Sequence, residues 1–135
     1  MGDGEANVDD DVITTKLSDR SVDATVARLI ELLDAGGLKR FAVIDQRAEA
    51  RAVGLDLRAT VLVIFGSPAA GTPVMAAAPL AAVELPLKIV VWADRGQTKV
   101  SYPTPSRLAA RHHLSDDLAR NLAGIDHLTD ALVAP

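Results

Sequence analysis

The chain has 135 residues, of which 49% are hydrophobic and 24% charged, and this length and composition fit one folded domain with one core. Its formal charge is −4, but residues 1–11 carry five acidic side chains and no Lys or Arg, so the rest has 14 basic and 13 acidic residues. A nearly neutral body lacks the basic surface that holds a phosphate backbone, so we expect no nucleic-acid partner.

The first elements follow an acidic start. We expect residues 1–10 to be a disordered acidic tail and residues 11–135 to form a single α+β domain, with a first strand starting at Val12. Ser21 can cap a helix whose apolar residues recur at the 3.6-residue period, and Gly36 and Gly37 can end it.

Two further strands are predicted in the middle of the chain. Residues 38–45 alternate between two faces, and a short helical turn over 47–53 should follow and end at Gly54. Residues 59–65 are apolar on both faces, which is typical of a central strand that is covered on each side or lies at a subunit contact.

The second half begins with short helical pieces and a hairpin. Within residues 67–84, Thr72 followed by Pro73 predicts a helix start, and Pro79 should break or restart that helix. A strand over 85–93, a turn and a strand over 98–102 then form a β-hairpin.

Two helices are expected at the end of the chain. Thr104 can cap a short one, and Ser115 can cap the last one, in which Gly124 is a weak point. The order β-α-β-β-β-β-α predicts an α+β fold, with a curved antiparallel sheet, short helices in the connections and a long C-terminal helix on one face.

Short signatures in the chain resemble the domain-of-unknown-function 302 family. They are Ile44 and Asp45; Gly54 and Leu55; Phe65 and Gly66; Gly71, Thr72, Pro73 and Met75; Leu85, Pro86 and Leu87; Trp92; Tyr102; Arg111 and His112. The resemblance implies a fold similar to that of the TATA-binding protein and association as a homodimer. It implies no reaction, because the family has no established biochemical role.

The chain departs from the family pattern at two positions. Gln46 stands where the family usually has histidine, and Ser67 stands where it usually has asparagine. A glutamine amide neither titrates near neutrality nor binds transition metals well, so an acid–base or metal role at position 46 is not expected.

The weak catalytic candidates are Asp45, Arg111 and His112, which would have to meet in one concavity together with the loop from Gly66 to Thr72. Arg111 could clamp a ligand, or could pair with Asp45 or Glu84 and tie the last helices to the sheet; we favour the tie. No complete catalytic set is visible. A serine nucleophile at Ser67 lacks the glycine two residues later that a nucleophile elbow needs.

The candidate ligand-binding residues lie in the loop after residues 59–65 and on the hairpin. The loop precedes a helix N-terminus, where free N–H groups can hold an anion. The hairpin carries two of the four aromatic residues, which we expect to be cross-strand neighbours. They are Gly66, Ser67, Gly71, Thr72, Trp92 and Tyr102.

Metals, cofactors and membranes are not expected. His112 and His113 are adjacent and point about 100° apart on a helix, and the pair His113 and Asp117 supplies too few zinc ligands. The chain has no cysteine. A helix needs about 20 consecutive apolar residues to cross a bilayer, and every apolar run in the sequence is much shorter. With no signal-peptide pattern at the N-terminus, we expect a cytoplasmic protein.

The leading functional hypothesis is a small, soluble, non-enzymatic homodimeric module that binds a small molecule or a protein partner. It rests on the surplus of apolar strand surface and on the lack of a complete catalytic set. The alternative is an enzyme of unknown reaction class that uses Asp45, Arg111 and His112.

Overall fold

The structure is a computed structural model that describes residues 12–135. The predicted tail therefore lies outside the described residues. The strands of this range are β1 (Ile13–Ser18), β2 (Lys39–Asp45), β3 (Thr60–Gly66), β4 (Leu87–Asp94) and β5 (Gln97–Pro103). The helices are α2 (Val22–Ala35), α3 (Gln46–Ala52), α4 (Pro68–Ala77), the 3₁₀-helix η1 (Pro79–Val83), α5 (Pro105–Arg111) and α6 (Asp116–Val133).

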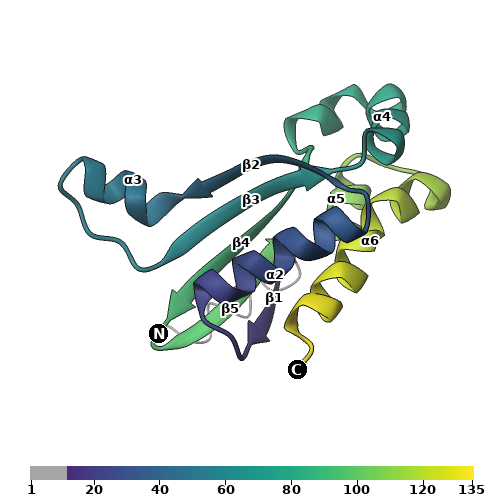
Figure 1. Ribbon diagram of the computed structural model, residues 1–135. Helices are drawn as coiled ribbons and strands as arrows, with labels where there is room; N and C mark the ends of the chain where they lie inside the picture. The colour runs from purple at the N-terminus through teal and green to yellow at the C-terminus, as the bar shows by residue number, and fades with distance from the viewer. Residues whose placement is uncertain (1–11) are drawn as a thin grey trace, which may run out of the picture.

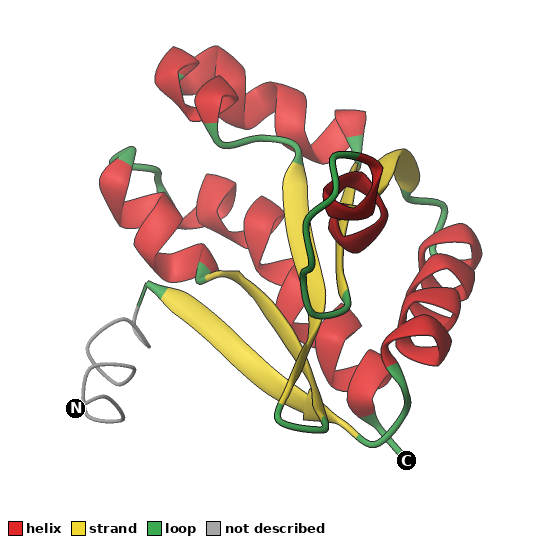
Figure 2. Cartoon of the chain, turned by 90° about the vertical axis from the view of Figure 1, so that its left-hand side faces the viewer, coloured by secondary structure: helices red, strands yellow, loops and turns green. Residues whose placement is uncertain are grey.

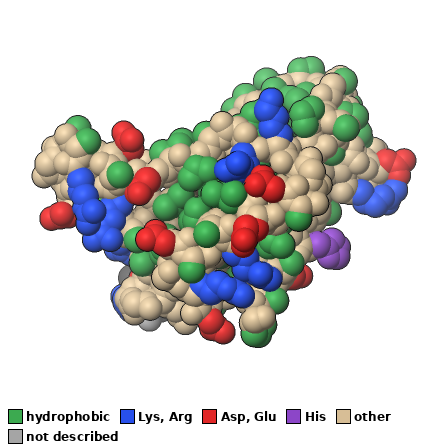
Figure 3. All heavy atoms as spheres, viewed as in Figure 1, with side chains coloured by type: hydrophobic (Ala, Val, Ile, Leu, Met, Phe, Trp, Pro, Cys, Tyr) green, Lys and Arg blue, Asp and Glu red, His purple; other side chains and the backbone are tan. Residues whose placement is uncertain are grey.

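The five strands of residues 12–135 form one antiparallel sheet in the order β1-β5-β4-β3-β2. Viewed from the side, the strands twist against one another (Figure 2). The element order confirms the predicted α+β class, with short helices in the connections and a long C-terminal helix. Helix α3 lies at one end of the sheet and α4 at the other (Figure 1), and both ends project in the space-filling view from the same side (Figure 3).

The long helices begin at the predicted caps. The Ser21 Oγ accepts a hydrogen bond from the Ala24 N–H at 3.1 Å, and the Ser115 Oγ accepts one from the Leu118 N–H at 3.3 Å. Helix α2 ends at Gly36, and Gly37 follows with a φ of 69°, which is strained for residues with a Cβ. The predicted helix start at Thr72 and Pro73 is wrong. Helix α4 begins five residues earlier, because Ser67 caps it and Pro68 takes its first position.

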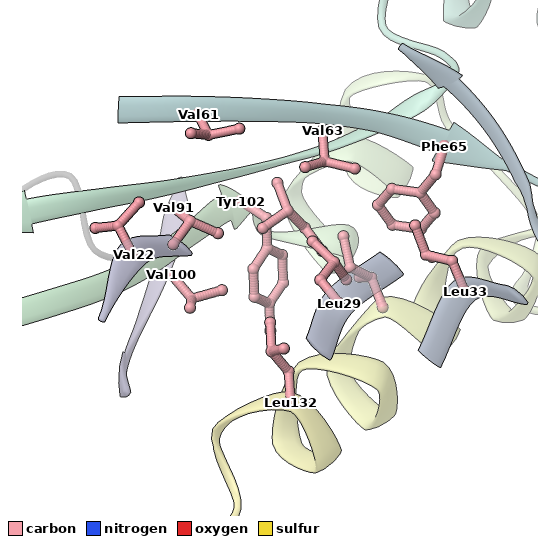
Figure 4. Close-up of a cluster of buried hydrophobic side chains, with 12 residues drawn as sticks. Val22, Leu29, Leu33, Val61, Val63, Phe65, Val91, Val100, Tyr102 and Leu132 are labelled. Carbon is pink, nitrogen blue, oxygen red and sulfur yellow. The ribbon is translucent and has the colours of Figure 1, made fainter. Parts of the chain in front are cut away.

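One face of the sheet carries the main core. Alternate strand residues such as Val63, Ile89 and Val100 are fully buried beneath side chains of α2 and α6, including Leu29 and Leu132. Figure 4 shows Val63, Val100, Leu29 and Leu132 among the side chains that converge between the strands and the two helices. Side chains of a strand alternate between the two faces of a sheet, so only about every second strand residue enters this core. The remaining residues lie on the opposite face, which an antiparallel sheet can leave outside the core.

The other face of the sheet, which we call the open face, is also apolar. Its central residues alternate in sequence with the core residues and are partly exposed. They are Ile44 on β2, Leu62 and Ile64 on β3, and Val90 and Trp92 on β4. The apolar character of both faces of β3, noted in the sequence, is therefore divided between the core and the open face.

Candidate functional site

A cavity of about 400 Å³ lies where the end of β3 meets helices α4 and α6. Its walls come from the start of β2, from the turn between β3 and α4, from the start of β4 and from one face of α6. The apolar side chains that line it are Leu38, Phe41, Phe65, Pro68, Ala70, Met75, Leu85, Pro86, Leu87, Leu122, Ile125 and Leu128. No charged side chain of residues 12–135 lines it.

Glycines keep part of this cavity open. A Cβ placed on Gly66 would come within 3.7 Å of Pro86 and 3.8 Å of Phe41, and a Cβ on Gly71 would come within 3.9 Å of Met75. At Gly124, on α6, a Cβ would meet nothing within 4 Å. Side chains at these positions would therefore occupy space that a ligand could fill.

The polar groups in the wall are few. The Ser67 Oγ accepts a hydrogen bond from the Ala70 N–H at 3.2 Å, which is the capping role that its place after the strand predicts. The Asn121 Nδ2 donates to the Ala70 carbonyl at 3.1 Å, so it ties α6 to α4. Ser67 and Asn121 can give a ligand orientation, whereas its affinity would have to come from apolar contact.

Three predicted ligand residues, Gly66, Ser67 and Gly71, line this cavity, whereas Thr72 does not. Sequence reasoning did not connect the loop with Phe41, Asn121 or Gly124, which complete the walls. The signal for Gly124 was present, because a glycine inside a helix lowers helix stability by about 1 kcal/mol and needs a reason.

Beside the cavity wall, Glu84 joins the two basic residues at the end of α5. Arg111 donates from Nη1 to one carboxylate oxygen of Glu84, and the Nε2 of His112 is hydrogen-bonded to the other. The side chain of His112 is mostly buried, and that of Arg111 is half exposed. The predicted tie between Arg111 and Glu84 is confirmed, and it also engages His112.

Asp45 is far from this cluster, so the predicted convergence of Asp45 with Arg111, His112 and the Gly66 loop is wrong. Asp45 pairs with Val61 at the start of β3, whereas Gly66 ends that strand. Five residues of extended strand separate the two positions by about 17 Å. The Asp45 carboxylate accepts a hydrogen bond from the Ala48 N–H at 2.9 Å, and therefore caps α3.

A second, more polar cavity of about 440 Å³ lies at the Asp45 end of the sheet. Ser21, Arg47, Arg51 and Gln97 are among the residues that line it. Asp45 thus lines this second cavity, whereas Glu84 directly precedes Leu85, which lines the apolar cavity at the opposite end of the strands.

Trp92 and Tyr102 are not cross-strand neighbours, and neither lines the apolar cavity. The turn at Arg95 and Gly96, both with positive φ, pairs Asp94 with Gln97. This register places Trp92 opposite Lys99 on the open face. Tyr102 points to the other face of the sheet and is 1% exposed in the core.

Tyr102 belongs to a polar network that ties the sheet to α6. Its hydroxyl donates to Asp126 Oδ1 at 2.6 Å and accepts from the Thr129 hydroxyl at 3.2 Å. Lys16 of β1 reaches Thr129 at 2.7 Å and Asp130 at 2.7 Å. Burial and then the hydrogen bond to Asp126 raise the pKa of the Tyr102 phenol.

The histidine pair does not form part of a metal cluster. Among residues 12–135, no three His, Cys, Asp or Glu side chains gather as metal ligands. His113 has a φ of 52° just after α5, and Asp117 pairs with Arg120 on the surface. No helix of the same range is both long and apolar enough to cross a membrane.

Residues 13–132 match the model of the family described as domain of unknown function DUF302, so the chain belongs to this family. A crystal structure of an uncharacterized conserved DUF302 protein from Bacillus stearothermophilus superposes with a TM-score of 0.77. It is 24% identical and covers 90% of this chain and 95% of its own, and it therefore supports the fold. The likeness to the TATA-binding protein stays a prediction.

Two curated relatives are named as fluoride channels. The chain is 33% identical over 117 residues to the fluoride-specific ion channel FluC 1 of Brucella suis, and equally to FluC 2 of Brucella melitensis. The match covers 84% of this chain but only 46% and 43% of those proteins. The chain thus spans less than half the length of these relatives.

Proposed function

We propose that this chain is a non-enzymatic homodimeric module that binds a small, largely apolar molecule in the cavity between β3, α4 and α6. The observation that carries this proposal is the cavity itself, which has a volume of about 400 Å³ and is lined mainly by apolar side chains. Binding sites for small molecules typically have volumes of about 300 to 1,000 Å³, apolar walls and a few fixed polar groups.

The glycines in the cavity walls and the contact between α6 and α4 support a preformed binding site. Gly66, Gly71 and Gly124 leave space in three different walls, and the hydrogen bond from Asn121 to Ala70 holds α6 and α4 beside each other. Filling such a space with an apolar ligand removes apolar surface from water, which stabilises the complex by about 25 cal/mol per Å².

We do not retain the enzyme hypothesis, because its three residues do not share a cavity. Asp45 caps α3 at the far end of the sheet, and Arg111 and His112 both bond to Glu84. Proximity of acid, base and substrate is the first requirement of general acid–base catalysis.

The homodimer in this proposal forms through the open face. Ile44, Leu62, Ile64 and Val90 present adjacent apolar side chains there, and Trp92 extends the same surface. In a dimer with twofold symmetry, the same surface of each subunit contacts its counterpart on the other, so a single apolar face is enough to form the interface. The proposal includes a cytoplasmic location, with which a chain without cysteine is compatible.

A second candidate function is an accessory role beside a fluoride channel. The 33% identity to proteins named fluoride-specific ion channels favours it, since domains that share one chain in some proteins can associate as separate chains in others. Surface plasmon resonance tests this role. The protein is immobilised on the sensor surface, and a detergent-solubilised fluoride-specific ion channel is passed over it. Saturable binding would support this role, and its absence at micromolar channel concentrations would exclude it.

Native mass spectrometry tests the binding proposal. The chain is sprayed as purified and again after incubation with decan-1-ol, beside the variants Gly124→Leu and Ala131→Leu. We expect decan-1-ol or a co-purified molecule on the wild type and on Ala131→Leu, whose new side chain lies outside the cavity. Gly124→Leu should bind neither, because its side chain occupies the space beside α6. Equal binding by all three proteins would contradict the proposal.

A further inference from the structure

We infer that the molecule held in this cavity is amphipathic and carries an anionic head group, which Lys39 meets at the cavity mouth. This inference rests on the proposed function and names its ligand class. It comes from Lys39, whose ammonium group lies over the ring of Phe41 in the cavity wall. The ammonium group of Lys88 also contacts this wall, but it is engaged by the carbonyl groups of Glu84 and Pro86.

Lys39 is the first residue of strand β2, next to the cavity. It pairs across the sheet with Gly66, and its neighbour Leu38 lines the cavity, as does Phe41. The Lys39 Nζ lies 5.2 Å from the centroid of the Phe41 ring. The ring therefore presents one part of its surface to the cavity and another to the ammonium group, which is a favourable partner of an aromatic face.

The charges nearby leave this ammonium group available. Arg40, the next residue, pairs with Asp34 at 3.4 Å. Within residues 12–135, Lys39 has no ion pair and no side-chain hydrogen bond, and it is exposed to solvent. No acidic side chain of the same residues lines the cavity.

The cavity and Lys39 together favour a ligand with an apolar chain, which the cavity would hold, and an anionic group, which Lys39 would contact. An aliphatic chain would pack against Phe65, Met75 and Leu122 inside, where a charge would lose its hydration without a partner. A carboxylate at the mouth would stay partly hydrated and would lie near the Lys39 ammonium. An exposed ion pair of this kind is worth up to about a fivefold gain in affinity, and salt weakens it.

Isothermal titration calorimetry with decanoate and decan-1-ol tests the inference, because the two probes share a chain length and differ in charge. At low ionic strength we expect the wild type to bind decanoate about three- to fivefold more tightly than decan-1-ol. Lys39→Met should remove this preference and leave decan-1-ol affinity unchanged, and Lys39→Arg should keep it. Arg47→Met, which removes a positive charge at the other end of the sheet, should have no effect on either probe.

The outcomes separate this inference from the proposed function. Equal affinity for the two probes, or a decanoate preference that survives in Lys39→Met, would overturn the role of Lys39 and leave the cavity as a binding site. A decanoate preference lost in Arg47→Met would also overturn it, because the carboxylate would then lie at the other end of the sheet. Failure of both probes to bind would overturn the proposed function and this inference together.

Discussion

Arg111, the last residue of α5, forms an ion pair with Glu84, which lies between η1 and β4. The same carboxylate bonds to His112, so one acidic side chain holds both residues at the C-terminal end of a short helix. Leu85 and Pro86, which follow Glu84, line the cavity. The tie therefore fixes one wall of the proposed binding site.

Glu84→Gln should lower the free energy of unfolding by about 1 kcal/mol, because it removes the charge shared by Arg111 and His112 while the amide keeps the shape. Urea denaturation monitored by circular dichroism measures this difference. Asp117→Asn is the control, since its pair with Arg120 on α6 is largely exposed and should contribute less than about 0.5 kcal/mol. Equal effects of the two changes would show that Glu84 is not a structural tie.

Alanine at two glycines should change stability in opposite directions. Gly124→Ala adds a Cβ in open space inside α6, and should raise the free energy of unfolding by about 1 kcal/mol and the Tm by about 3 to 5 °C. Gly37→Ala also meets open space, but its φ of 69° should cost about 1 to 2 kcal/mol. Differential scanning calorimetry checks both signs. A destabilising Gly124→Ala would mean that α6 needs a glycine for backbone reasons.

Tyr102 should ionise only above its ordinary pKa of about 10, since burial and Asp126 favour the neutral phenol. It is the single tyrosine of the chain, so absorbance at 295 nm follows this group alone. A raised folded-state pKa means that the unfolded state loses the proton first, and the stability from this group is lost as the pH rises above 10. Tyr102→Phe should remove that part of the pH dependence. A midpoint at or below 10 in the folded protein would contradict the buried network.

Sedimentation velocity should show a dimer at micromolar concentrations. Leu62→Glu should give a folded monomer, because it places a charge in the middle of the open face. Leu80→Glu is the matched control: Leu80 is 76% exposed on η1, outside the sheet, and its change should leave the dimer intact. Emission from Trp92, the single tryptophan, should shift to shorter wavelength on dimerisation. A wild-type monomer at high micromolar concentration would contradict the homodimer.

Local signals predicted most of the elements. The caps at Ser21 and Ser115 and the stop at Gly36 depend on a few neighbouring residues, and the helices begin and end there in the structure. The start of α4 was predicted wrongly, because the helix begins at Pro68 behind its Ser67 cap and Pro73 lies inside it.

The site depends on register, which local patterns do not contain. The two-residue turn at Arg95 and Gly96 sets which residues face each other, and a change of one residue would move Trp92 to the face of Tyr102. The antiparallel pairing of β2 with β3 likewise sends Asp45 and Gly66 to opposite ends. The segment from Gly66 to Thr72 was recognisable as a candidate, although most of it belongs to helix α4 and not to a loop. Asn121 and Gly124 join it only through the packing of α6.

The most direct test of the proposed binding site is a titration of ¹⁵N-labelled protein with decan-1-ol, followed in two-dimensional ¹H–¹⁵N spectra. We expect the amide signals of Gly66, Ser67, Gly71 and Ile125 to move together and saturably. Those of residues 46–52, beside the second cavity, should stay in place. Shifts confined to residues 46–52, or no shifts up to the solubility limit of the alcohol, would contradict a binding site between β3, α4 and α6.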